Sequence, residues 1–181
     1  MASDASSSMK PHAVCLPFST QSHISAMVNL AKLLHHRCLY ITFINTEFNY
    51  RRLLEAGDLR FLDNLPAGFQ FMAIPDGLPP AQSNATQDIA SLCQSARLFM
   101  GAPFCELIGK LNERAESVSG FPPVSCIMAD SVMAYSADPA SEEYRIPVVR
   151  LYTIAACALV KLMHLPKLKE KSSTPPNGTP C

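Results

Sequence analysis

Five short apolar runs alternate with segments of helical periodicity along this chain, and this alternation limits its possible folds more than any other feature. The runs are continuously apolar, which is typical of strands that are buried on both faces. They span residues 12–18, 39–45, 69–75, 124–130 and 146–153. Strands that are joined through helices form right-handed βαβ crossovers and a parallel sheet. The sequence therefore predicts an α/β fold with a Rossmann-like parallel sheet and flanking helices.

Helical patterns fill the intervals between these runs. Apolar side chains recur at helical spacing from Ile24 to Leu34. Thr46 suits the N-cap of the second helix, and Gly57 suits the position after its last turn. Two later helices contain a proline, which lacks a backbone N–H and disturbs a helix interior. The remaining predicted helices cover residues 88–116 with a break near Pro103, 131–144 around Pro139, and 154–165.

The two ends of the chain are polar and cannot bury much apolar surface. We therefore expect a disordered leader over residues 1–10, one domain over 11–165 and a disordered tail over 166–181. No apolar run reaches the roughly 20 residues that cross a bilayer, and no secretory signal is visible. The seven cysteines are scattered without a C-x-x-C pair. This pattern indicates buried free thiols in a reducing cytoplasm, rather than disulfides or a metal site.

Charge and motifs exclude several function classes. Lys plus Arg is 15 and Asp plus Glu is 15, so nothing in the charge favours nucleic acid or an anionic membrane as a partner. A G-x-G-x-x-G turn after the first strand and a Walker A loop are both missing, which disfavours a dehydrogenase-type dinucleotide site. No G-x-S-x-G elbow surrounds Ser22 or Ser131, so a serine hydrolase has no support.

Two polar residues stand where predicted strands give way to helices. His23 follows the first strand within "STQSH", and Asp130 ends the fourth. Ligands of parallel sheets bind outside the carboxyl ends of the strands, where neighbouring ends meet. An imidazole can take a proton near neutral pH, and a carboxylate behind it fixes its tautomer. A helix N-terminus disfavours extra positive charge on the ring. The two residues are a candidate base and its partner.

Ordinary explanations of the same residues stay open at this point. A histidine in a strand-to-helix turn is commonly solvated or capping, and Asp130 before "SVMAY" is a natural helix N-cap. His35 and His36 lie late in the first helix, where we expect them to interact with its C-terminal end.

Several segments taken together resemble a known family. "KPHAVCLPFSTQSHISAMVNLAKLLHHR", "ITFINTEFNYRRLLEA", "IPDGLPP" with "ATQDI", and "CIMADSVM" are similar, in collinear order, to the N-terminal acceptor-binding domain of plant UDP-glycosyltransferases. These are inverting family 1 enzymes with the GT-B fold. The resemblance covers roughly residues 10–165. "NTEFNYRRLL" and "IPDGLPP" are most like the subgroup that glucosylates terpenoid, cyanohydrin and phenolic acceptors.

The resemblance implies a reaction. His23 would deprotonate a hydroxyl of a small plant metabolite such as a flavonoid or terpenoid, with Asp130 as its partner. The oxygen would then attack the anomeric carbon of a UDP-sugar, with glucose as the usual sugar, and displace UDP with inversion. No metal or other cofactor is implied. The other implied site residues are Phe18, Gln21 and Met133 for the acceptor, and Ser19, Thr20 and Thr153 for the donor sugar.

The chain departs from the family pattern near the implied site. "Q-G-H-x-x-P" is replaced by "Q-S-H-I-S-A", which places Ser22 and Ala26 at the turn. Pro139, "Tyr144-Arg145" in place of "L-G", Arg150 inside a strand, and Tyr152 in place of Trp are further departures. A proline inside a helix costs about 3 kcal/mol unless a kink absorbs it, and a buried unpaired arginine is also costly. We therefore expect altered geometry near Thr153.

The family's C-terminal UDP-sugar-binding domain has no counterpart in the sequence, which contains no Trp. We expect a truncated member whose sheet ends in an exposed apolar edge and which transfers sugar weakly or not at all. Two alternatives remain. One is a noncatalytic fragment that binds small molecules or regulates a full-length relative. The other is a fragment that does not fold stably.

Overall fold

The computed structural model describes residues 9–55, 65–79 and 86–170. The chain divides into two compact units, one that ends at Leu151 and one that begins at Tyr152, and each is described by itself. Three sequence-based expectations fall largely outside the described residues: the disordered leader, the end of the second helix at Gly57, and the tail beyond residue 170.

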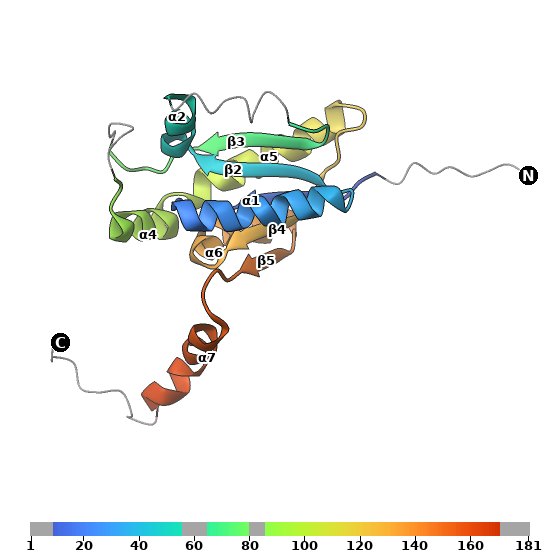
Figure 1. Cartoon of the computed structure of the whole chain (residues 1–181). Helices are drawn as coiled ribbons and strands as arrows, with labels where there is room; N and C mark the ends of the chain where they lie inside the picture. Colours follow the sequence, from blue (N-terminus) through green and yellow to red (C-terminus); the bar gives the residue numbers. More distant parts are fainter. Residues whose placement is uncertain (1–8, 56–64, 80–85, 171–181) are drawn as a thin grey trace, which may run out of the picture. The chain divides into compact units, whose positions relative to one another are not determined.

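The first unit is built on a five-stranded parallel sheet in the order β3-β2-β1-β4-β5 (Figure 1). The predicted α/β fold with a parallel sheet is thus confirmed. β5 is shorter than expected at both ends, and its late start follows from Pro147, which has no N–H to donate to a neighbouring strand. The strands are β1 (His12–Leu16), β2 (Tyr40–Thr46), β3 (Phe69–Ile74), β4 (Val124–Asp130) and β5 (Val148–Leu151).

Helices cover both faces of this sheet (Figure 1). One face packs against α1 (Gln21–His36), whose Met27 and Ala31 are fully buried. The other face packs against α4 (Ile89–Leu98), α5 (Gly101–Ser117) and α6 (Ala134–Tyr144). Alternate residues of β1 point into the two layers, so this central strand is buried on both sides. α2 (Glu47–Glu55) follows β2, and a short 3-10 turn, η1 (Ser131–Met133), precedes α6.

Both prolines that were expected to disturb helices are accommodated. The break in the 88–116 stretch lies between α4 and α5, at residues 99–100, and Pro103 follows it in the first turn of α5. The missing N–H has no partner to lose there. Pro139 lies inside α6, which continues through it to Tyr144.

Strand order places the potential site. The chain leaves β1 toward β2 and β3 on one side, and adds β4 and β5 on the other. The direction of winding therefore reverses between β1 and β4. Open α/β sheets bind ligands at such a switch point, outside the carboxyl ends of the strands.

Two expectations about single residues are wrong. Arg150 is not a buried unpaired charge, because β5 is an edge strand. Its guanidinium is about half exposed and donates to Asp138 Oδ1 at 3.4 Å. Every cysteine that the structure describes is free, as expected, but only Cys15 is fully buried, and Cys38 and Cys157 are exposed.

In the second unit, the residues that the structure describes form one helix, α7 (Ala156–Glu170). α7 continues through Pro166 to Glu170, although the sequence predicts a disordered tail from residue 166 onward. Across the described residues, no helix has both the length and the apolar character needed to cross a membrane.

Candidate active site

Two backbone hydrogen bonds shape the turn between β1 and α1. The N–H of Thr20 donates to the carbonyl of Phe18 at 2.8 Å, and the N–H of Ile24 donates to the carbonyl of Thr20 at 2.9 Å. Thr20 is the N-cap of α1 in an extended conformation, yet its side chain makes no capping bond. The positive end of the α1 dipole therefore meets this polar turn.

Asp130 ends β4 and is fully buried. One carboxylate oxygen, Oδ1, accepts the N–H of Val132 at 3.0 Å and so caps η1. The other, Oδ2, lies 2.7 Å from Nδ1 of His23. The ordinary explanation and the functional one are therefore both compatible with the geometry, because each oxygen has its own partner. A buried carboxylate needs such partners to offset its lost hydration.

His23 is the third residue of α1, and its side chain remains 23% exposed. Its ring packs edge-on against Phe18, with centroids 5.4 Å apart. An ionised carboxylate only accepts hydrogen bonds, so Nδ1 carries the proton in a neutral ring. Nε2 is then the basic nitrogen. This arrangement suits proton abstraction near neutral pH, with the imidazolium stabilised by Asp130.

The structure places the other predicted site residues in different surroundings. Ser19 and Thr20 are half-buried at the turn, and Gln21 is exposed at the start of α1. Phe18 is only 4% exposed and Met133 is fully buried in the core. Thr153 belongs to the second unit. The roles of these six residues in binding acceptor or donor stay predictions.

Two asparagines near the turn were missed by sequence reasoning. Asn49 Nδ2 donates to the carbonyl of Ser19 at 3.1 Å and to Asn45 Oδ1 at 3.2 Å. The only sequence signal was their place in the "NTEFN" segment, which contributed to the resemblance. The predicted N-cap Thr46 is confirmed, since its Oγ1 accepts the N–H of Asn49 at 3.3 Å.

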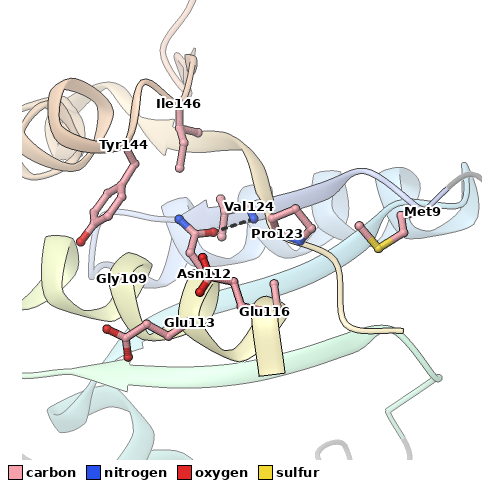
Figure 2. A pocket seen from close by; sticks show the side chains of 10 residues that line it. Met9, Gly109, Asn112, Glu113, Glu116, Pro123, Val124, Tyr144 and Ile146 are labelled. Atoms are coloured by element: carbon pink, nitrogen blue, oxygen red, sulfur yellow. Dashed lines mark hydrogen bonds between the residues drawn. The ribbon is translucent and has the colours of Figure 1, made fainter. Parts of the chain in front are cut away.

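The described residues contain no cluster of three His, Cys, Asp or Glu side chains that could hold a metal ion. A cavity of about 580 Å³ lies at the amino ends of the strands, between α5 and the start of β4 (Figure 2). Asn112, Glu113, Tyr144 and Ile146 are among its lining residues. A smaller hollow of about 200 Å³ lies beside Asp76 and Arg51, after β3.

No family model matches the chain. Curated relatives match it strongly. A 7-deoxyloganetin glucosyltransferase of Catharanthus roseus is 48% identical over 168 residues, which are 93% of this chain and 34% of that protein. A (R)-mandelonitrile beta-glucosyltransferase of Prunus dulcis is 44% identical over 173 residues, which are 96% of this chain and 35% of that protein. The chain thus spans about a third of the length of these relatives.

Solved structures share the fold. Phytolacca americana UGT2, complexed with UDP-2fluoro-glucose and pterostilbene, matches with a TM-score of 0.64 and 18% identity, over 95% of this chain and 37% of that one. A UDP-glucosyltransferase from Polygonum tinctorium, capable of glucosylating indoxyl, matches with a TM-score of 0.62 and 20% identity, over 90% of this chain and 34% of that one. These matches support the fold alone.

Proposed function

We propose, from the premise that this chain is homologous along nearly its whole length to plant UDP-glycosyltransferases, that it serves sugar transfer to a small plant metabolite. The observation that best supports this proposal is the hydrogen bond of 2.7 Å between His23 Nδ1 and Asp130 Oδ2 at the switch point of the sheet. Both residues belong to the first unit.

In this proposal His23 is the general base. Nε2 takes the proton of an acceptor hydroxyl, and the imidazolium that forms is stabilised by the buried carboxylate behind it. General-base catalysis of this kind contributes typically 10²–10⁴-fold to a rate. The freed oxygen attacks the anomeric carbon of the UDP-sugar, the bond from that carbon to UDP breaks with inversion, and UDP leaves as the anion. No step requires a metal ion.

The substrates follow from the relatives. Glucosyltransferases that act on 7-deoxyloganetin and (R)-mandelonitrile support a hydroxyl-bearing terpenoid, cyanohydrin or phenolic acceptor and a UDP-glucose donor. Phe18, Gln21 and Met133 are proposed on the acceptor side, and Ser19, Thr20 and Thr153 on the donor side. The free thiols support a cytoplasmic location for the reaction.

The test is a stoichiometric assay with the purified chain, UDP-glucose and a panel of hydroxylated terpenoids, cyanohydrins and phenolics. Mass spectrometry would detect the glucoside. Because the chain spans about a third of its relatives' length, we expect at most a small amount of product, which His23→Ala abolishes. His36→Ala, a change of an exposed histidine on the same helix, should leave that amount unchanged. Product that persists in His23→Ala would contradict the proposal. A melting temperature raised by acceptors without any product would instead support a noncatalytic binding function.

A further inference from the structure

We infer that Asn49 is a positioning residue, which holds the turn before His23 and thereby aligns the imidazole with Asp130. The inference deepens the proposed function and rests on His23 as its base. Its starting point is one contact between elements far apart in sequence. Asn49, in the first turn of α2, donates from Nδ2 to the carbonyl of Ser19, 30 residues earlier.

The orientation of the Asn49 amide is fixed by its acceptors. The carbonyl of Ser19 can only accept, so the group that faces it is the NH₂. The same NH₂ donates to Asn45 Oδ1 at 3.2 Å. Asn45 Oδ1 also accepts the N–H of Thr46 at 2.9 Å, which fixes the Asn45 amide in turn. The side chains of Asn45 and Asn49 are at most 9% exposed. Among the described residues, every buried side-chain nitrogen and oxygen has a hydrogen-bond partner, and a buried network of paired groups rigidifies its surroundings.

This side chain is not needed to cap α2. Thr46 Oγ1 already accepts the N–H of Asn49, which is the usual N-cap bond. The Asn49 amide instead reaches from its own helix to the β1–α1 connection. Since β1 and β2 are neighbours in the sheet, their carboxyl ends bring the two segments together.

The Ser19 carbonyl is well placed to orient His23. The next residue, Thr20, provides the carbonyl that starts the hydrogen bonds of α1, by accepting the N–H of Ile24. His23 lies within that first turn. A shift of the Ser19 peptide therefore moves the start of α1, and with it the Nδ1 atom that meets Asp130 at 2.7 Å.

The test is NMR on the purified full chain, labelled with ¹⁵N and ¹³C, with the His23 signals identified by their loss in His23→Ala. We expect the parent chain to show the Nδ1–H tautomer, with an Nδ1 proton protected from exchange with water. Asn49→Ala should speed that exchange at least tenfold and reduce the population of this tautomer. Asp130→Ala, which removes the acceptor, sets the change that follows complete loss of the contact.

Asn112→Ala is the matched control. Asn112 likewise ties its helix to a backbone group of a distant segment, because its Oδ1 accepts the N–H of Val124 at 3.0 Å. This contact lies at the start of β4, away from Asp130 at the end of that strand (Figure 2). Asn112→Ala should lower the urea midpoint about as much as Asn49→Ala and leave His23 exchange within twofold of the parent. A folded Asn49→Ala chain with unchanged His23 exchange overturns the inference, and so does an equal change in Asn112→Ala.

A second measurement covers an Asn49→Ala chain that does not fold. In the parent chain, exchange of the Asn49 Nδ2 protons and the His23 Nδ1 proton is followed at increasing urea. If the two kinds of proton lose their protection at the same urea concentration, the inference is supported. If the His23 proton stays protected after the Asn49 protons exchange freely, the inference is overturned. Neither measurement involves sugar transfer. If the exchange of His23 depends on Asn49 but no sugar is transferred, the proposed function is wrong and the role of Asn49 stands. If sugar is transferred but the exchange of His23 does not depend on Asn49, only the role of Asn49 is wrong.

Discussion

Asp130 accepts a hydrogen bond from His23 across the point where the winding of the sheet reverses, with 2.7 Å between Oδ2 and Nδ1. The carboxylate is fully buried, whereas the imidazole retains access to solvent. A base that exchanges protons with a substrate needs such access, and its partner needs to be shielded from water so that their interaction stays strong. The pair thus combines a fixed tautomer with an accessible ring.

Replacing Asp130 by alanine should lower the free energy of unfolding by roughly 2–4 kcal/mol, because it removes the cap of η1 and the partner of His23 together. Urea denaturation at neutral pH measures this. Asp138→Ala is the control, since this half-exposed carboxylate pairs with Arg150 at the surface, and its loss should cost no more than about 1 kcal/mol. Equal losses in the two variants would contradict a special role for Asp130.

Local sequence patterns were sufficient for much of the fold. β4 has the predicted bounds, because its apolar run is enclosed by prolines on one side and Asp130 on the other. It was also predictable that His23 follows β1 and that Asp130 ends β4. Their contact required β4 to lie beside β1 as well, and strand order depends on packing between distant segments, which no local pattern specifies.

Residues with distant partners were missed. Asn49 looks in the sequence like any polar residue of a first helical turn, and its bond to Ser19 depends on how β1 and β2 end side by side. His12 begins the first apolar run, and no local pattern marks it as a buried polar residue. Its burial depends on Thr42 and Pro122, which reach it from β2 and from the approach to β4.

His12 should make the fold sensitive to acid. Nδ1 donates to the carbonyl of Pro122 at 2.9 Å, and Nε2 meets Thr42 Oγ1 at 2.7 Å. Burial lowers the pKa of His12 from 6.5 to about 4. Between these two values the unfolded chain binds a proton that the folded chain does not. The free energy of unfolding should therefore fall as the pH drops from 6.5 to 4, by up to about 3 kcal/mol.

Urea denaturation at several pH values between 7.5 and 4 measures this contribution. His12→Gln removes the titrating group, so its free energy of unfolding should be lower at pH 7.5 but should decline less toward pH 4. His36→Gln, at an exposed position of α1, should follow the parent curve. Parallel curves for the parent and His12→Gln would show that His12 does not cause the acid sensitivity.

Arg145→Gly should stabilise the fold. Arg145 follows α6 with φ 54° and ψ 39°, the left-handed conformation that glycine adopts without strain, and its N–H closes the helix on the carbonyl of Ser141. We expect a gain of roughly 0.5–1 kcal/mol in the free energy of unfolding. Arg37 ends α1 with φ −87°, a conformation in which glycine relieves no backbone strain. Arg37→Gly should therefore be neutral or destabilising. A gain in both variants would refute the conformational explanation.

Gly77→Ala should destabilise the fold for two reasons that can be separated. Gly77 has φ +67°, and a Cβ built there would overlap the ring of Phe99. Gly120 has φ +84°, but a Cβ there would meet no atom within 4 Å. Gly120→Ala therefore measures the backbone strain alone, about 1–2 kcal/mol, and Gly77→Ala should exceed it by roughly 1–3 kcal/mol of overpacking.

The double variant Gly77→Ala with Phe99→Ala distinguishes the two contributions. Without the ring, Gly77→Ala should cost only about as much as Gly120→Ala, since contacting residues couple in such cycles. Urea denaturation of the parent chain, the two single variants and the double variant gives the coupling free energy directly. A Gly77→Ala loss that is the same with and without the Phe99 ring would mean that the turn after β3 requires glycine for its backbone conformation only.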